Sequence, residues 1–161
     1  MSYHNQLVSK LYTKESISTV LEEWKNNKQK IVFTNGCFDI LHRGHVEYLA
    51  KAKDLGTKLI IGLNTDDSVK RLGKSPERPI NNEESRAVVL AALACVDAIV
   101  LFNEDTPLQL IESVLPHVLV KGSDYKLEDI VGYKAVTENG GEVKTIDFVK
   151  GFSTTSILNK L

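Results

Sequence analysis

The chain is organised around the stretch Ile31-Val32-Phe33-Thr34-Asn35-Gly36-Cys37-Phe38-Asp39-Ile40-Leu41-His42-Arg43-Gly44-His45. Its first residues are β-branched and aromatic and end at Asn35-Gly36, which is the pattern of a buried strand followed by a turn. Beyond the turn, Val46, Leu49 and Ala50 recur at helical spacing, and Gly56 is placed to end that helix. The two histidines are therefore expected where a helix begins.

A helix start that follows a strand and a glycine turn is suited to bind phosphate. The first N–H groups of a helix have no partner within it and carry the positive end of its dipole, so an anion is favoured there. His42 and His45 share one face at i,i+3 spacing, and Gly44 between them lets a ligand approach the backbone. Imidazole donates hydrogen bonds to phosphate oxygens and, when protonated, offsets the charge that develops as a phosphoryl bond breaks. Surface or capping histidines are the less favoured alternative, because the strand and the turn precede this pair.

The composition favours one domain that binds a small ligand. The 161 residues suit a single domain with a proper core. Lysine and arginine number 20 against 21 aspartates and glutamates, so we expect no nucleic-acid partner. No apolar run approaches membrane-spanning length and the N-terminus lacks an apolar signal core, which predicts a cytoplasmic protein with no membrane partner.

The two cysteines, Cys37 and Cys95, have no metal-ligand spacing and fall in different predicted elements. We therefore expect buried thiols and no disulfide. A nucleophilic role for Cys37 is the less favoured alternative to a small residue that fills a tight loop.

An amphipathic helix is predicted from Lys14 to Lys28, with an apolar stripe of Ile17, Val20, Leu21 and Trp24. We expect this stripe to pack on the rest of the domain or on a partner subunit. The sequence is accordingly divided into an N-terminal helical extension, residues 1–28, and a main domain, residues 29–161.

Strands alternate with helices through the rest of the chain. Further strands are predicted at 58–64, 97–102, 117–121 and 142–148, with a core-facing helix marked by Val89, Ala92, Leu93 and Val96 and a closing helix from Ile157 to Leu161. This alternation predicts an α/β fold, a Rossmann-like doubly wound parallel sheet of about five strands. Ligands bind at the carboxyl ends of such strands.

Four polar segments are expected to meet at that edge of the sheet: the histidine turn, Asn64 to Asp66, Lys121 to Asp124, and the Ser-Thr-rich residues 153–156. Asp66 faces the ligand on this interpretation, and the equally favoured alternative is that Thr65 or Asp66 caps the next helix. No Walker lysine motif and no Gly-x-Gly-x-x-Gly is present, which argues against a P-loop or an ordinary dinucleotide site.

A basic, proline-broken loop spans residues 71–80. Such loops often close over phosphates, and Lys74 and Arg78, with Arg86 on the following helix, are candidates to bind a second anionic group. Solvated surface charge is the ordinary alternative for any one of them.

Residues 35–45 resemble the signature of the cytidylyltransferase-like nucleotidyltransferase superfamily, and Gly151 to Thr155 resembles its second signature. The resemblance covers nearly the whole chain and is closest to the heptose 1-phosphate adenylyltransferases of the ADP-heptose pathway, through residues 62–69, 78–80, 96–97, 102–107, 120–125 and 140–143. It implies transfer of AMP from ATP to a sugar 1-phosphate, a heptose 1-phosphate, for lipopolysaccharide or surface-glycan precursors. Mg²⁺ accompanying ATP and a homodimer are further implications. The length resembles the stand-alone form, since a sugar kinase precedes this domain in bifunctional relatives.

Placement and resemblance together give the expected site residues. The catalytic set is His42, His45, Lys74 and Arg86. The nucleotide-binding set is Thr34, Asn35, Gly36, Cys37, Phe38, Gly44, Lys121, Gly122, Asp124, Ser153, Thr154 and Thr155. The substrate-binding set is Asp39, Asn64, Asp66 and Arg78, and the protein ligands of the metal are not predicted.

Two departures from the resemblance keep alternatives open. The arginine that glycerol-3-phosphate cytidylyltransferases carry before their second signature is replaced by Phe148-Val149-Lys150, which counts against that enzyme. The basic loop reads Gly73-Lys74 instead of the usual Lys-Gly order, which leaves the role of Lys74 open. The alternatives are a glycerol-3-phosphate or ethanolamine-phosphate cytidylyltransferase and a non-catalytic nucleotide-binding module. The paired histidines and the Ser-Thr segment speak against the binding module.

Overall fold

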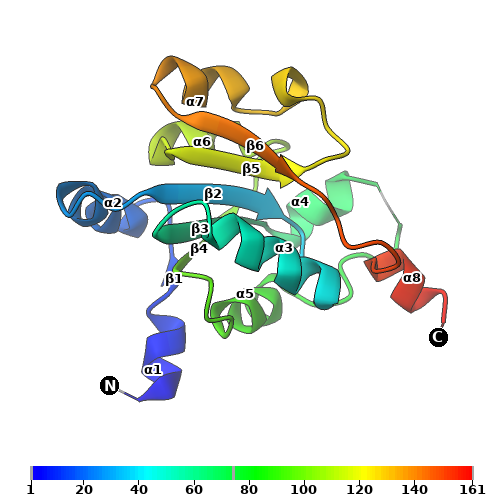
Figure 1. Cartoon of the computed structure of the whole chain (residues 1–161). Coiled ribbons are helices and arrows are strands. Elements are labelled where there is room, and N and C mark those ends of the chain that lie inside the picture. Colours follow the sequence, from blue (N-terminus) through cyan, green and yellow to red (C-terminus); the bar gives the residue numbers. More distant parts are fainter. Residues whose placement is uncertain (1, 74, 161) are drawn as a thin grey trace.

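A parallel sheet of six strands runs through the centre of the molecule (Figure 1). The structure is a computed structural model that describes residues 2–73 and 75–160. The strand order is β1-β4-β3-β2-β5-β6, and every neighbouring pair is parallel. The strands are β1 (Leu11–Tyr12), β2 (Ile31–Gly36), β3 (Lys58–Asn64), β4 (Ala98–Phe102), β5 (Val118–Gly122) and β6 (Glu142–Ile146).

Helices cover both faces of the sheet, because side chains alternate along each strand. In β2, Ile31 and Phe33 belong to one core cluster and Val32 belongs to the other. The first layer contains α2 (Ser16–Asn26), α6 (Leu108–Val114) and α7 (Tyr133–Glu138), and the second contains α1 (Tyr3–Val8), α3 (Arg43–Lys53) and α5 (Glu83–Ala91). The remaining short helices are α4 (Asp66–Arg71), η1 (Leu127–Asp129) and α8 (Thr154–Leu158). None of the helices described is long and apolar enough to cross a membrane.

The predicted fold class, a doubly wound parallel α/β sheet, is confirmed. The sheet has one strand more than the five expected, because Leu11–Tyr12 pairs with Ile99 and Val100 as the edge strand β1. Two residues are too few to show the alternation by which a strand is read from sequence. The short elements α1, η1 and α7 were not predicted either, and each is too short to show a clear helical period.

Two predicted helices differ from those in the structure. In α5 the core-facing residues are Ala87, Leu90 and Ala91, whereas Val89 is 48% exposed. The helix ends at Ala91, so the apolar residues beyond it do not continue its face. The closing helix begins at Thr154, earlier than expected, because Ser153 and Ser156 form a reciprocal capping box there. Leu161, its expected last residue, lies outside the described residues.

The apolar stripe of α2 is buried within the domain. Ile17, Leu21 and Trp24 belong to the same core cluster as Ile31 and Phe33 of β2. The predicted boundary at residue 28 therefore falls inside one continuous core. Burial of the stripe also removes the sequence-based reason for expecting a partner subunit over this helix.

The order of the sheet determines where a ligand can enter. β2 lies between β3 and β5, and the helices that follow β2 and β5, α3 and α7, cover opposite faces. A crevice opens where connections leave to opposite sides, at the carboxyl ends of the strands. Figure 1 shows the arrowheads of the central strands pointing to one side of the molecule, where α8 also lies.

We predict that Leu21→Ala lowers the free energy of unfolding by about 2–5 kcal/mol, because it opens a cavity in the shared core. Denaturant unfolding followed by circular dichroism measures the change, and a single transition is expected. Glu22→Ala, on the exposed face of α2, is the control and should change stability by less than about 0.5 kcal/mol. A loss below about 1 kcal/mol for Leu21→Ala would show that α2 is peripheral to the fold.

Candidate active site

The histidine turn joins the carboxyl end of β2 to the start of α3. His42 is the N-cap residue of α3, with extended backbone, and its side chain makes no capping hydrogen bond. The rings of His42 and His45 stack with centroids 3.8 Å apart and an angle of 20° between their planes. Gly44 permits this arrangement, because a Cβ atom there would lie 3.0 Å from the ring of His42. Both imidazoles therefore project together from the helix start.

Three buried polar atoms have no hydrogen-bond partner in the described part of the chain: Asn35 Oδ1 near the end of β2, and His42 Nδ1 and His45 Nδ1 at the start of α3. Buried polar groups are normally paired, and an unpaired one costs about 1–3 kcal/mol. Helix starts also attract anions through their unpaired N–H groups. This set of atoms is therefore suited to a polar ligand with phosphate oxygens.

Burial keeps both imidazoles neutral near pH 7. Burial, with a smaller effect of neighbouring His42, lowers the pKa of His45 to about 4, against an opposing backbone hydrogen bond with Ile40. Burial also lowers the pKa of His42. A phosphate beside them would favour the charged form, so binding of an anion is expected to be accompanied by proton uptake.

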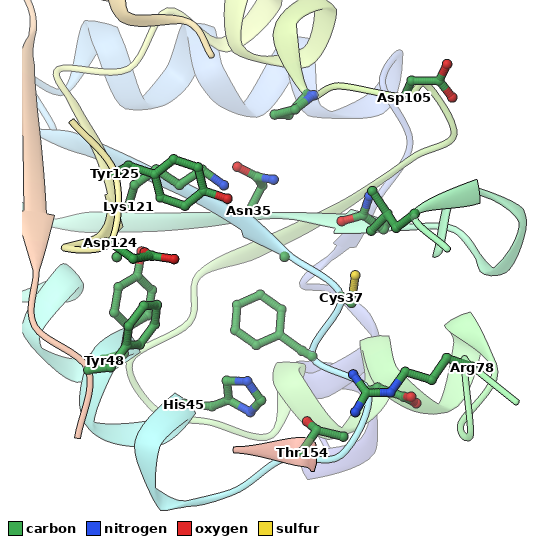
Figure 2. Close-up of a pocket in the computed structure, with 18 residues that line it drawn as sticks. Asn35, Cys37, His45, Tyr48, Arg78, Asp105, Lys121, Asp124, Tyr125 and Thr154 are labelled. Carbon is green, nitrogen blue, oxygen red and sulfur yellow. The ribbon is translucent and has the colours of Figure 1, made fainter. Parts of the chain in front are cut away.

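A cavity of about 400 Å³ opens beside the turn, at the carboxyl ends of β2 and β5. We call it the first cavity. In Figure 2, His45, Arg78 and Thr154 lie toward one end and Lys121, Asp124 and Tyr125 toward the other. Of the predicted nucleotide-binding and substrate-binding residues, those lining it are Asn35, Gly36, Cys37, Phe38, Asp39, Asn64, Arg78, Lys121, Gly122, Asp124 and Thr154.

A second cavity of about 400 Å³ lies on the other side of the histidines, against the start of α8. Its lining includes His42, Gly44, Ser153 and Thr155, and it shares four residues with the first cavity, namely His45, Arg78, Phe148 and Thr154. The hydroxyl of Ser153 caps α8 by accepting a hydrogen bond from Ser156 N at 3.0 Å. Thr155 Oγ1 accepts one from Arg78 Nη2 at 3.3 Å. The two family-like segments, residues 35–45 and 151–155, thus meet around one space.

Arg86 does not line either of these cavities, which corrects the expectation that it contacts phosphate directly. Its side chain is 1% exposed, and its three donor groups are all engaged. It donates to Asn81 O at 3.0 Å, to Cys37 O at 2.7 Å and to Asp66 Oδ1 at 2.8 Å. Arg86 therefore holds the histidine turn against the segment that follows the basic loop.

Asp39 makes a second connection between the same two segments. It is 5% exposed, and its carboxylate accepts hydrogen bonds from the backbone N–H groups of Ile80 and Asn81 at 2.9–3.0 Å. Its own carbonyl accepts from Asn81 Nδ2 at 2.7 Å. The expected contact of this carboxylate with substrate is replaced by a positioning role, because backbone donors occupy both oxygens.

Three further residues that were predicted to contact ligand instead make hydrogen bonds within the protein. Thr34 is fully buried below the cavity, where its hydroxyl donates to Val120 O at 3.0 Å. Asn64 lines the first cavity but donates to Ser68 Oγ at 2.9 Å. Asp66 accepts from Arg86 and lines neither cavity, and Thr65 is the residue that caps α4. Lys74 lies outside the described residues.

Sequence reasoning predicted Phe38 but missed the other aromatic side chains of the site. Tyr48, Phe148 and Tyr125 line the first cavity, and Phe152 lines the second, with the Arg43 guanidinium carbon 5.4 Å from its ring centroid. Lys121 Nζ lies 5.7 Å from the ring centroid of Tyr125. The only signal available in the sequence was the presence of Phe148 and Phe152 near Gly151, in a segment where a soluble surface ordinarily carries polar residues.

The side chains described do not form a metal cage. No group of three or more His, Cys, Asp or Glu residues is clustered for a cation among the described residues. Asp39 in the first cavity already accepts three backbone hydrogen bonds.

We predict that His45 in the ligand-free protein titrates near pH 4 and that inorganic pyrophosphate raises this midpoint. Its folded-state pKa lies below the unfolded value of about 6.5, so the unfolded state binds more protons between these values. The free energy of unfolding should therefore fall as the pH drops from about 6.5 to about 4. NMR of imidazole ¹⁵N shifts measures the titration, and a midpoint above 6 without ligand, or one insensitive to pyrophosphate, would contradict the assigned environment.

Comparison with known sequences places this geometry in a family. The model of the family described as Cytidylyltransferase-like matches residues 33–160. Bifunctional protein HldE of Syntrophotalea carbinolica is 51% identical over 153 residues, which cover 95% of this chain and 31% of that protein. Bifunctional protein HldE of Geobacter metallireducens is 50% identical over 158 residues, 98% of this chain and 32% of that protein. The chain thus spans about a third of the length of the curated relatives it matches.

Two solved structures are similar to this chain. The lipopolysaccharide core biosynthesis protein of Thermoplasma volcanium is similar with a TM-score of 0.63 and 30% identity, covering 77% of this chain and 99% of that one. Pantoate-beta-alanine ligase of Francisella tularensis, complexed with beta-gamma ATP and beta-alanine, has a TM-score of 0.65, 14% identity and coverage of 94% and 72%, which shows a shared fold. Since the family match includes β2, the histidine turn and α8, the chain belongs to the cytidylyltransferase-like family.

Proposed function

We propose that the protein transfers AMP from ATP to a heptose 1-phosphate, giving ADP-heptose and pyrophosphate for lipopolysaccharide or surface-glycan precursors. The observation that supports the transferase part is the stacked pair of His42 and His45 at the start of α3, each with a buried Nδ1 atom that has no partner among the described residues. The HldE relatives, at about half identity, support the adenylyl group and the heptose. The lipopolysaccharide core protein of similar structure supports the same class of product.

The reaction needs one in-line displacement. A phosphate oxygen of the sugar attacks the α-phosphorus of ATP, the new P–O bond forms, and the bond to the bridging oxygen breaks with its electron pair leaving on pyrophosphate. A phosphate monoester is already ionised near neutral pH, so it needs no general base. Positioning and charge stabilisation are the contributions required of the protein.

The residues divide these contributions between them. His42 and His45, with the N–H groups at the start of α3, donate to oxygens of the triphosphate and stabilise the charge that moves to pyrophosphate. Thr154 and Thr155 bring the start of α8 to the same phosphates, and Arg78 lies beside them as a cation. Lys74 stays a candidate for a further phosphate contact, in the loop that precedes Arg78. Mg²⁺ is part of the ATP substrate.

Positioning residues keep these groups in place. Asp39 and Arg86 fix the histidine turn to the end of the basic loop, so they orient Arg78 without touching substrate. A buried charge-assisted network of this kind is rigid because the loss of any partner leaves another polar group unpaired.

Two wider properties complete the proposal, a cytoplasmic location and a homodimer. Both are supported by resemblance to the adenylyltransferase group. A partner surface is not assigned, since the apolar stripe of α2 is already buried.

We predict that His42→Ala and His45→Ala each lower kcat by about a hundredfold or more, the scale of losing one preorganised donor to a developing charge. Pyrophosphate release with saturating ATP and heptose 1-phosphate measures the rate. His4→Ala, a change of the same kind at an exposed position on α1, is the control and should leave the rate unchanged. Near-normal turnover in either site variant would remove the proposed role of that histidine.

The substrate assignment is tested with equal ATP and CTP in the presence of heptose 1-phosphate, glycerol 3-phosphate or phosphoethanolamine. We expect ADP-heptose as the main product and little product from the two alcohol phosphates. Chromatographic separation identifies each nucleotide product. Mostly CDP-linked product would refute the adenylyl assignment and leave nucleotidyl transfer standing, whereas nucleotide binding without product from any pair would favour the binding module.

A further inference from the structure

Phe148 occupies an unusual position for a large apolar side chain. It is 53% exposed, yet it lines both the first and the second cavity. It follows β6 on the segment that leads to α8, outside any helix or strand. An apolar ring that is exposed at the junction of two cavities suggests a contact with a ligand.

Tyr48 supports one side of this ring. The Tyr48 and Phe148 rings stack with centroids 5.8 Å apart and an angle of 25°. Tyr48 is 6% exposed, and its hydroxyl lies 2.8 Å from Thr34 Oγ1, which donates to Val120 O on β5. Phe148 therefore rests on a side chain that is anchored inside the sheet, while more than half of its own surface stays open.

Gly122 leaves room for the ring at the end of β5. A Cβ atom at this position would overlap Cε2 and Cζ of Phe148 and lie 2.8 Å from Asp124 Oδ1. Gly122 is not among the glycines with positive φ, so its backbone does not require glycine. The absence of a side chain at position 122 is explained by the space that the aromatic ring takes.

The distribution of polar and aromatic residues indicates where the phosphates and the base of a nucleotide would bind. Histidines, threonines and the start of α8 surround the junction of the two cavities, which suits phosphate. Away from this junction, the first cavity carries the rings of Tyr48 and Tyr125, and Phe148, which lines both cavities, stacks on Tyr48. A nucleotide bound by its phosphates at the histidines would extend its base toward these rings, where base stacking on an aromatic side chain is favourable.

We propose that Phe148 is a specificity-determining residue on which the nucleobase stacks, and that it favours a purine over a pyrimidine. A purine covers more of an aromatic ring than a pyrimidine does, so the stack buries more apolar surface. This inference rests on the proposed function, since it assigns the nucleotide to the same site. It supplies a physical basis for a preference for ATP over CTP, which an acceptor such as Asp124 cannot provide because both bases carry an exocyclic amine.

The test compares the affinities of wild-type protein and Phe148→Leu for ATP, CTP and inorganic tripolyphosphate by calorimetry. Loss of a base stack should weaken the affinity for ATP about tenfold and the affinity for CTP about threefold or less. The affinity for tripolyphosphate should not change. Tyr3→Leu, which removes a ring that is 89% exposed on α1, is the matched control and should leave all three affinities unchanged. Thermal unfolding of Phe148→Leu should match that of the wild type, since the ring is largely exposed.

Gly122→Ala tests the same inference with Phe148 retained. The added methyl group displaces the far end of a flexible side chain, so the protein should fold while losing ATP affinity more than tripolyphosphate affinity. The proposal is overturned if Phe148→Leu weakens ATP and tripolyphosphate equally, leaves ATP affinity unchanged, or alters only the KM for the sugar phosphate. Failure of the proposed function looks different: the wild type would bind ATP with this selectivity but form no nucleotide sugar.

Discussion

The parallel pairing of β2 with β5 is the constraint on which the rest of the site depends. It brings two chain segments together that are far apart in sequence, the histidine turn after β2 and residues 121–125 after β5. Because α3 and α7 then cover opposite faces of the sheet, the space between the strand ends stays open. The start of α8 returns to the same edge and supplies hydroxyl and N–H groups, so residues 153–155 and the histidine turn line one space.

Two kinds of buried polar group meet in this space, and their partners distinguish them. Each side-chain nitrogen of Arg86 and each carboxylate oxygen of Asp39 bonds to the protein, so these two residues hold the loops in place. His42 and His45, in contrast, each have a buried Nδ1 atom without a hydrogen-bond partner among the described residues. The first pair is suited to position and the second to bind, because an unpaired buried nitrogen gains a full hydrogen bond when ligand arrives. A nucleotidyl transfer that relies on fixed geometry requires both kinds.

The sequence predicted the fold class, the strand Lys58–Asn64 and the shared face of the two histidines, because each depends on local periodicity. It did not distinguish ligands from positioning residues. Arg86 and Asp39 carry the charges that phosphate sites use, but Arg86 donates to Cys37 O and Asp39 accepts from Asn81 N, and pattern cannot show contacts between segments so far apart in the chain. Phe148 was predicted only as the end of the last strand, which in fact ends at Ile146, and as part of the segment that stands in place of an arginine, since its stack on Tyr48 is a long-range contact.

The central claim is that fixed geometry and charge at the histidine turn suffice for nucleotidyl transfer, without a covalent bond to Cys37 or to either imidazole. A single in-line displacement inverts the configuration of the α-phosphorus, whereas two successive displacements retain it. The most direct test is therefore the stereochemical course of the reaction with a single diastereomer of ATPαS and heptose 1-phosphate, read by ³¹P NMR of the thio-substituted ADP-heptose. We predict inversion, and retention would contradict the account.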